Sequence, residues 1–212
     1  MYLSNPKRVQ KVLFYLAGHP WHIPFYWMYS VRASSPLDVG LPWWSLPAIH
    51  FVDHEISRSS HVFEYGSGGS TLFLGQRFAQ LTSIEQDSEW ALKVNHKLTD
   101  HKMNKVELLQ PEINLTSMED FERSDYLLSL HTNHDLIVVD GEDHFGPDST
   151  WSARTSCFLR AENFINKGGV ILVDDSWRYP EIRKLSKAKE VKILEGIGPC
   201  RKGVTSTDLH FY

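Results

Sequence analysis

The sequence predicts an α/β fold built on a doubly wound, mostly parallel sheet, and two observations support this. Short runs rich in Val, Ile and Leu alternate with longer segments of helical periodicity between residues 62 and 173. These runs are apolar throughout, which is typical of parallel strands covered by helices on both faces. A length of 212 residues suits one such domain with an N-terminal extension, and a hydrophobic fraction of 42% is enough for its core.

The first predicted helix covers about residues 48–57. Ile49, Val52 and Ile56 give it one apolar face, and Pro47 is well placed at its first turn. Beyond it, the predicted strands are residues 62–63, 81–85, 106–109, 135–140 and 170–173. The predicted helices between them are residues 70–78, 88–100 and 152–165, with a mixed segment at residues 118–130.

The C-terminal part of the chain is expected to finish the sheet. Gly168 and Gly169 are predicted to end the helix at residues 152–165. Two further strands, at residues 191–194 and 208–212, follow without a convincing helix between them. The prediction is therefore a sheet of seven strands.

Residues 1–60 are predicted to form a helical or irregular extension to the domain at residues 61–212. Residues 12–31 contain no Asp, Glu, Lys or Arg, and their length is near that of a membrane span. Prolines interrupt this segment, and its many aromatic residues favour interfaces over bilayer centres. We therefore expect an arm that packs on the domain, as a lid over the substrate pocket, or on a partner. Association with a membrane surface stays open as an alternative, whereas a spanning helix is not expected.

Charge and cysteine content limit the classes of partner and location. The formal net charge is −4, so the composition shows no basic footprint for nucleic acid. Cys157 and Cys200 have no metal-ligand spacing, and two reduced thiols are typical of a cytoplasmic protein. No secretory signal is evident near the N-terminus. The expected location is the cytoplasm, and a homodimer stays open.

A glycine-rich stretch at residues 62–71 is the candidate ligand-binding element. It connects a predicted strand to a predicted helix, a geometry that presents backbone N–H groups to a ligand. Gly66 and Gly68 lack a Cβ, which permits a tight turn and the close approach of a ligand. A plain flexible loop is the alternative. Glu64 and Glu85 favour the binding loop, because a carboxylate about 20 residues beyond such a turn accepts bonds from both ribose hydroxyl groups of a nucleotide.

The type of cofactor follows from the sixth position of the glycine pattern. A dinucleotide-binding loop has a third glycine there, whereas this chain has Thr71, so the fit to NAD is poor. The acidic residue and two glycines, followed by Glu85 at the end of the next strand, resemble motif I of the class I S-adenosylmethionine-dependent methyltransferases. The resemblance extends over about residues 60–212 and implies that family's seven-stranded sheet with an antiparallel C-terminal strand. It also implies S-adenosylmethionine as cofactor, bound by Glu64, Gly66, Ser67, Gly68, Ser70, Thr71, Glu85, Gln86 and Asp140.

Acidic residues follow the predicted strands at the edge where ligands bind in such a sheet. Asp140 ends one strand, Asp174 follows the next, and His144 lies close after Asp140 in the sequence. Methyl transfer requires alignment of donor and acceptor and often the removal of an acceptor proton. The candidate catalytic residues are therefore Asp140, His144 and Asp174, with His144 as a base near neutral pH. A solvated loop histidine is the alternative for His144.

A magnesium ion is the alternative to a protein base. Asp140 and the pair Asp174–Asp175 resemble the ligands of the metal-dependent catechol-type O-methyltransferases, and oxygen ligands suit Mg²⁺. That family has a Lys where this chain has Asp143, and an Asn where it has Asp175. Magnesium is thus a candidate that the sequence does not favour, and metal ligands stay unknown.

The resemblance implies an enzyme that transfers a methyl group from S-adenosylmethionine to an oxygen or nitrogen of a small molecule or saccharide. Nucleic acid is not expected as a partner. A non-catalytic module that binds S-adenosylmethionine or a nucleotide is the second hypothesis, and an NAD-dependent oxidoreductase, disfavoured by Thr71, is the third. The polar loop from Asp140 to His144 favours catalysis, because a pure binding module would not need it.

Overall fold

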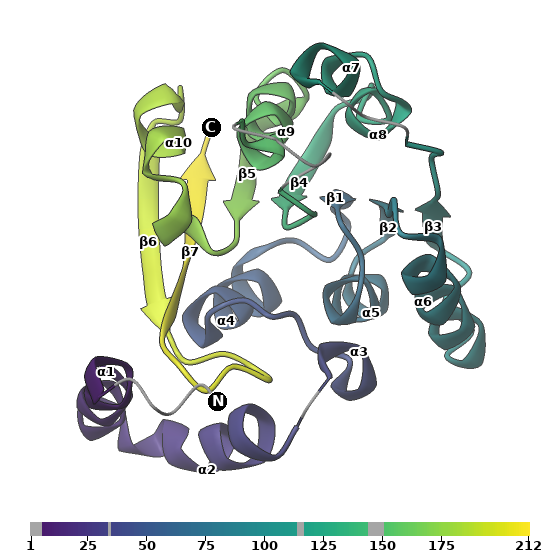
Figure 1. Cartoon of the computed structure of the whole chain (residues 1–212). Coiled ribbons are helices and arrows are strands. Elements are labelled where there is room, and N and C mark those ends of the chain that lie inside the picture. Colours follow the sequence, from purple (N-terminus) through teal and green to yellow (C-terminus); the bar gives the residue numbers. More distant parts are fainter. Residues whose placement is uncertain (1–5, 34, 114–116, 144–150) are drawn as a thin grey trace.

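The computed structural model describes residues 6–33, 35–113, 117–143 and 151–212. One seven-stranded sheet runs through this part of the chain in the order β3-β2-β1-β4-β5-β7-β6 (Figure 1). Strands β1 to β5 pair in parallel, and β7 is antiparallel to both of its neighbours. The strands are β1 (His61–Tyr65), β2 (Gln80–Ile84), β3 (Val106–Leu109), β4 (His134–Val139), β5 (Ile165–Val173), β6 (Glu190–Gly196) and β7 (Thr205–Phe211). The predicted fold class and the antiparallel C-terminal strand are confirmed.

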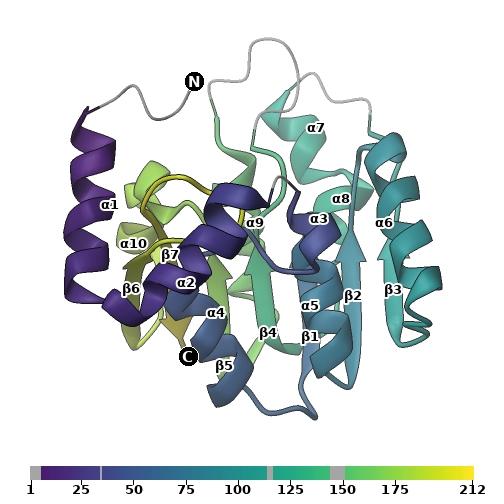
Figure 2. The ribbon, with the colours of Figure 1, turned by 90° about the horizontal axis from the view of Figure 1, so that it is seen from below.

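Helices cover both faces of this sheet (Figures 1 and 2). The helices of residues 61–212 are α5 (Gly69–Arg77), α6 (Ser88–Asp100), α7 (Met118–Glu122), α8 (Asp125–Leu128), α9 (Ala153–Ala161), the short η3 (Ser176–Arg178) and α10 (Pro180–Leu185). Residues 1–60, the predicted extension, contribute α1 (Pro6–Gly18), η1 (Pro20–His22), α2 (Ile23–Phe25), η2 (Tyr26–Arg32), α3 (Pro36–Val39) and α4 (Leu46–Glu55). The helices predicted at residues 48–57, 70–78 and 88–100 correspond to α4, α5 and α6, with ends that differ by no more than two residues.

Alternate residues of the central strands point into two hydrophobic cores, one on each face of the sheet. Phe63 and Tyr65 pack in the core that contains Phe158 of α9, whereas Val62 packs in the core that contains Phe73 of α5. Successive side chains of a strand face opposite sides, so a sheet buried on both faces needs apolar residues at nearly every position. Each large side chain buried in this way stabilises the fold by about 1.5–3 kcal/mol. This accounts for the apolar runs in the sequence.

The prediction that Gly168 and Gly169 end a helix is wrong. α9 ends at Ala161, and both glycines lie within β5. Gly168 has a φ of +84°, and a Cβ on Gly169 would lie 2.9 Å from the carbonyl oxygen of Asp135. The pairing of β4 with β5 changes register at this point, and glycines are typical of such irregular strand pairs. A glycine pair marks a helix end or a strand irregularity equally well, so the sequence pattern does not separate the two.

The extension contacts two separate parts of the domain. Near its middle, the hydroxyl of Ser30 donates to the carbonyl oxygen of Gly198 at 2.7 Å, in the loop between β6 and β7. Further on, the backbone around α3 lies against the turn between β1 and α5, where a Cβ on Gly69 would clash with the carbonyl oxygen of Leu41. Within the described ranges, no helix is long and apolar enough to cross a membrane.

Candidate functional site

The glycine turn between β1 and α5 lies at the carboxyl end of the parallel strands. Gly66 has a φ of +94°, and a Cβ there would lie 2.8 Å from the Cα of Gly141, which follows β4. Gly68 has a φ of +154°, and the nearest atom to a Cβ there is a ring carbon of Trp90 at 3.6 Å. Gly66 is thus required because two backbones touch, and Gly68 is required by its conformation. Of these two glycines, Gly68 is the one with open space beside its Cα.

The buried carboxylate of Glu64 fixes the glycine turn through hydrogen bonds. Glu64 is 0% exposed, and its Oε2 accepts hydrogen bonds from Thr71 Oγ1 at 2.7 Å and Ser83 Oγ at 2.8 Å. Thr71 Oγ1 also accepts the backbone N–H of Gly68 at 2.9 Å, which connects the carboxylate to the turn. Burial raises the pKa of Glu64 to about 7, although the nearby hydroxyl groups favour the ionised form. Its second oxygen, Oε1, is buried and has no hydrogen-bond partner.

Glu85, directly after β2, faces the same turn. Its Oε2 accepts a hydrogen bond from Ser67 Oγ at 2.8 Å, and its Oε1 accepts the backbone N–H of Asp87 at 3.0 Å. Trp90 Nε1 donates to the carbonyl oxygen of Ser67 at 2.9 Å and so fixes the turn from the side of α6. Burial raises the pKa of Glu85 above its ordinary value. The neighbouring Gln86 has a buried Oε1 without a hydrogen-bond partner.

Asp140, directly after β4, is held by two side chains from distant parts of the sequence. Trp44 Nε1 donates to its Oδ2 at 3.0 Å, and Arg154 Nη2 lies 3.2 Å from its Oδ1. Arg154 is buried, and its guanidinium also donates to the carbonyl oxygens of Gly141 at 2.8 Å and Asp174 at 2.9 Å. Burial raises the pKa of Asp140, and Arg154 opposes the rise. One guanidinium therefore connects the ends of β4 and β5.

Asp174 and Asp175, directly after β5, share a second arginine. Arg201 Nη2 lies 2.8 Å from Asp174 Oδ2, and Nη1 lies 2.6 Å from Asp175 Oδ1. The hydroxyl of Thr207 donates to the other oxygen of Asp174 at 2.8 Å. Burial, and then the charge of Asp140, raises the pKa of Asp174 to about 8. Burial would also raise the pKa of Asp175, but Arg201 outweighs it and the pKa is lowered.

The fold thus brings most of the predicted site residues to one edge of the sheet. Those residues are Glu64, Gly66, Ser67, Gly68, Ser70, Thr71, Glu85, Gln86, Asp140 and Asp174, which lie in or directly after β1, β2, β4 and β5 or in the first turn of α5. His144 lies outside the described residues.

Three side chains of the site were not predicted from the sequence: Trp44, Arg154 and Arg201. Trp44 belongs to a Trp pair in the extension, whose only signal was its aromatic content. Arg154 is one of two charged residues among residues 151–160, and Arg201 lies in a loop rich in Gly and Pro. Neither local pattern indicates an acidic partner, because the aspartates that pair with Arg154 and Arg201 lie 14 or more residues away in the sequence.

The two arginines bear on the question of a metal ion. Among the residues that the structure describes, no group of three or more His, Cys, Asp or Glu side chains is arranged to hold one. Instead, Asp140 and Asp174, the candidate magnesium ligands, are paired with Arg154 and Arg201. A guanidinium supplies positive charge and directional donors to a carboxylate without any metal.

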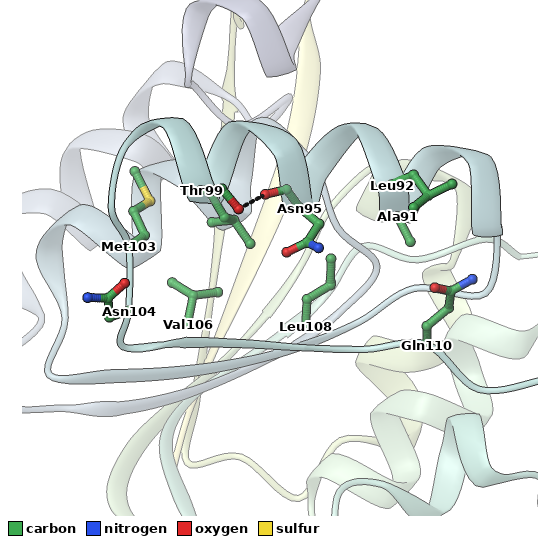
Figure 3. Close-up of a pocket in the computed structure, with 10 residues that line it drawn as sticks. Ala91, Leu92, Asn95, Thr99, Met103, Asn104, Val106, Leu108 and Gln110 are labelled. Carbon is green, nitrogen blue, oxygen red and sulfur yellow. Dashed lines mark hydrogen bonds between the residues drawn. The ribbon is translucent and has the colours of Figure 1, made fainter.

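A pocket of about 290 Å³ lies elsewhere, between α6 and the edge strand β3 (Figure 3). The residues that line it include Ala91, Asn95, Thr99, Met103, Val106 and Leu108. None of them is a predicted site residue, and the pocket holds no carboxylate, histidine or cysteine. Its chemistry does not match that of the strand ends, so the strand ends remain the candidate site.

Comparison with solved structures identifies the fold. The O-methyltransferase TomG of Streptomyces achromogenes, involved in tomaymycin synthesis and solved with S-adenosylmethionine, matches 98% of this chain and 99% of its own, with a TM-score of 0.62 and 16% identity. An O-methyltransferase of Bacillus cereus, solved with S-adenosylhomocysteine, matches 100% of this chain and 93% of its own, with a TM-score of 0.58 and 14% identity. An rRNA methylase of Streptococcus thermophilus matches 78% of this chain and 94% of its own, with a TM-score of 0.54 and 9% identity. No protein-family model and no curated protein matches the sequence.

Proposed function

Because the chain has the fold of the class I methyltransferases, we propose that it transfers a methyl group from S-adenosylmethionine to an oxygen or nitrogen of a small molecule or saccharide. The observation that carries the proposal is the meeting of the glycine turn, Glu85 and Asp140 at one edge of the sheet. When bound, S-adenosylmethionine supplies an activated methyl group on its sulfonium sulfur. The protein's part is to bind and orient both reactants and to accept a proton.

The residues around the turn fit the cofactor. Glu64 Oε1 and Gln86 Oε1 are buried acceptors without a donor, which is costly unless a ligand supplies one. The ammonium and adenine amino groups of the cofactor are donors of the required kind. Glu85 accepts hydrogen bonds from Ser67 Oγ and from the backbone N–H of Asp87, and a carboxylate has about four acceptor positions. It therefore keeps capacity for the two ribose hydroxyl groups.

Asp140 is the described residue best suited to orient the acceptor and to hold its proton. Trp44 and Arg154 fix its carboxylate, and burial raises its pKa, which favours proton uptake. The side chain of Asp174 is 0% exposed, whereas that of Asp140 is 18% exposed and so can reach a ligand. We therefore assign Asp174 a positioning role beside Asp140. His144 is retained as a candidate base.

We propose that this chemistry is independent of a metal ion, because Arg154 and Arg201 already pair with the carboxylates that would bind magnesium. The test is turnover measured with and without EDTA. Unchanged turnover is expected. Loss of turnover on chelation, with recovery on addition of Mg²⁺, would contradict this scheme and leave the methyltransferase proposal intact.

We further propose that residues 36–45 of the extension cover the site as a lid. The contact of Leu41 with Gly69 and the bond from Trp44 to Asp140 support this. Limited proteolysis is expected to cleave this segment more slowly when S-adenosylhomocysteine is present. Equal cleavage in both states would count against a lid.

Two features favour a small acceptor over nucleic acid. The net charge is −4, and the acidic residues gather at the strand ends, whereas a protein that binds RNA phosphates gathers Lys and Arg there. The similarity to the rRNA methylase concerns the fold and does not identify this chain's acceptor.

Isothermal titration calorimetry with S-adenosylmethionine, S-adenosylhomocysteine and NADH tests the proposed function. Binding of the first two, without binding of NADH, is expected. Binding of NADH alone would support an oxidoreductase. Turnover is then followed as S-adenosylhomocysteine release with hydroxyl- and amine-bearing small molecules and saccharides, and binding without turnover on any of them would favour a non-catalytic module.

A further inference from the structure

Large apolar side chains gather on the outside of the N-terminal arm, which we define as residues 6–33. These side chains are between 51% and 83% exposed, and they are Leu13, Phe14, Trp21, Ile23, Trp27 and Met28. They occupy only 16 residues of sequence, whereas the other exposed large apolar side chains of the described chain are spread over residues 43–193. A concentrated apolar patch of this kind is typical of an interaction surface.

The opposite side of the arm is fixed to the domain. Val12 and Ser30 are buried, and Ser30 bonds to Gly198 in the β6–β7 loop. The backbone N–H of Cys200 donates to the carbonyl oxygen of Tyr29 at 2.6 Å. The arm therefore already uses its inner side for folding, and the apolar residues on its outer side are not needed for that contact.

The arm presents its helices as a flat layer. In Figure 1, α1 is seen nearly end-on and α2 nearly lengthwise, both along the lower border of the molecule. In Figure 2, which looks from below, α1 lies at the left border beside β6, and the ribbon labelled α2 runs in front of the sheet. Two helices whose axes lie in one plane, with apolar side chains facing outward, match a planar partner better than a groove.

The positive charge of the arm indicates which kind of partner it binds. Lys7, Arg8, Lys11 and Arg32 are its charged residues at neutral pH, and it has no Asp or Glu, although the whole chain carries −4. Lys11 lies 3.4 Å from Glu195 of β6 in an exposed ion pair, and the formal charge over the whole arm is +4. A two-fold dimer through this patch would place the basic residues of one copy against those of the other. An anionic lipid surface instead offers negative charge to the basic residues and a headgroup boundary to Trp21 and the other aromatic side chains.

We propose that the outer side of the arm binds the surface of an anionic lipid bilayer, with its apolar side chains inserted at the headgroup boundary and its helices parallel to the membrane. The arm continues into residues 36–45, which contact the glycine turn. Binding would hold the whole domain at the membrane surface. This inference does not depend on the proposed methyl transfer.

The test is co-sedimentation of the full chain with vesicles of phosphatidylcholine alone and of phosphatidylcholine mixed with phosphatidylglycerol. Binding to the mixed vesicles, weakened by added salt, is expected. The arm variant Leu13→Gln with Ile23→Gln should reduce the partition coefficient by about tenfold or more, because two apolar side chains no longer leave water. The matched control, Leu92→Gln with Ile193→Gln, changes two side chains of similar exposure outside the arm and should bind as the wild type does.

A second readout locates the contact. Vesicles with brominated acyl chains should quench part of the tryptophan fluorescence of the wild type, and Trp21→Phe with Trp27→Phe should remove most of that quenching. Circular dichroism checks that each variant is folded. Equal binding to neutral and anionic vesicles, equal binding of the arm variant and its control, or no binding would each overturn the proposal. Sedimentation velocity that shows a dimer in the wild type and a monomer in the arm variant would assign the patch to a second copy of the chain instead.

Discussion

Replacing Glu64 with Gln should change the pH dependence of stability in a defined direction. Glu64 is fully buried on β1, and burial raises its pKa from about 4.5 in the unfolded chain to about 7 in the folded one. A carboxyl group with a raised pKa contributes stability that is complete below the unfolded pKa and is lost as the pH rises through the folded pKa. The loss corresponds to about 3 kcal/mol between pH 4.5 and 7, at about 1.4 kcal/mol for each unit of pKa shift.

Glutamine cannot ionise, so Glu64→Gln lacks this loss. Its amide oxygen can still accept hydrogen bonds from Thr71 and Ser83, as Glu64 Oε2 does. Its NH₂ group would occupy the position of Oε1, which has no protein partner, and an unsatisfied donor costs about 1–3 kcal/mol at every pH. The variant is therefore expected to be less stable than the wild type at pH 5. The difference should shift in the variant's favour by about 3 kcal/mol by pH 8.

Urea unfolding followed by circular dichroism at pH 5, 6, 7 and 8 measures both profiles. Glu55→Gln, which removes an exposed carboxylate at the end of α4, is the matched control and should leave the shape of the profile unchanged. A Glu64→Gln difference that is independent of pH, or that moves against the variant as the pH rises, would refute the assignment of a buried, easily protonated carboxyl group.

Four further predictions concern the site and the sheet. Glu85→Ala should weaken binding of S-adenosylhomocysteine by about 1.5–3 kcal/mol by calorimetry, and an unchanged Kd in a folded variant would remove Glu85 from the cofactor site. Arg201→Met should lower the free energy of unfolding by about 3–5 kcal/mol, because it leaves the buried carboxylate of Asp174 and the half-buried one of Asp175 without their partner, and a loss below 1 kcal/mol would contradict that pairing. Burial lowers the pKa of His210 to about 4, so the free energy of unfolding should fall by about 3 kcal/mol as the pH falls from 6.5 to 4. His210→Asn should lack this fall in urea titrations. Binding of S-adenosylmethionine at pH 7 should release protons from Glu64 and Asp174, so a calorimetric enthalpy that does not depend on the ionisation enthalpy of the buffer would speak against a cationic ligand beside them.

The sheet was predictable because its signal is local. Val62 and Phe63 face opposite cores, so both had to be apolar, and the same rule applied to every central strand. The glycine turn was also local, because the conformations of Gly66 and Gly68 require glycine whatever the rest of the fold does. Gly168 was misassigned, because the reason for that glycine is a register change with a strand about 30 residues earlier in the sequence.

The ion pairs and hydrogen bonds of the site were not predictable, because their partners are distant from one another in the sequence. Arg201 reaches Asp174 across 27 residues, and Trp44 reaches Asp140 across 96. Each of these pairs exists because the strand order brings two chain ends together, and hydrophobic periodicity carries no information on which loops meet. The sequence therefore identified the carboxylates, since Asp and Glu after strands are visible locally, but it could not identify the groups that determine their charge.

That charge gives the site its chemical preference. Glu64, Asp140 and Asp174 all have raised pKa values, and in each case burial is the largest cause. Two arginines serve three aspartates, because Asp175 shares Arg201, and Glu64 has no cationic partner among the contacts of its carboxylate in the structure. The edge of the sheet is thus short of positive charge at neutral pH and holds protons in its place. A ligand that carries a sulfonium and an ammonium group can supply the missing positive charge. A neutral ligand would leave the carboxyl groups protonated, and an anionic ligand would be repelled by those that are ionised. Electrostatics therefore supports a cationic cofactor at this edge independently of the likeness in fold, and a dinucleotide with a pyrophosphate would meet the opposite preference.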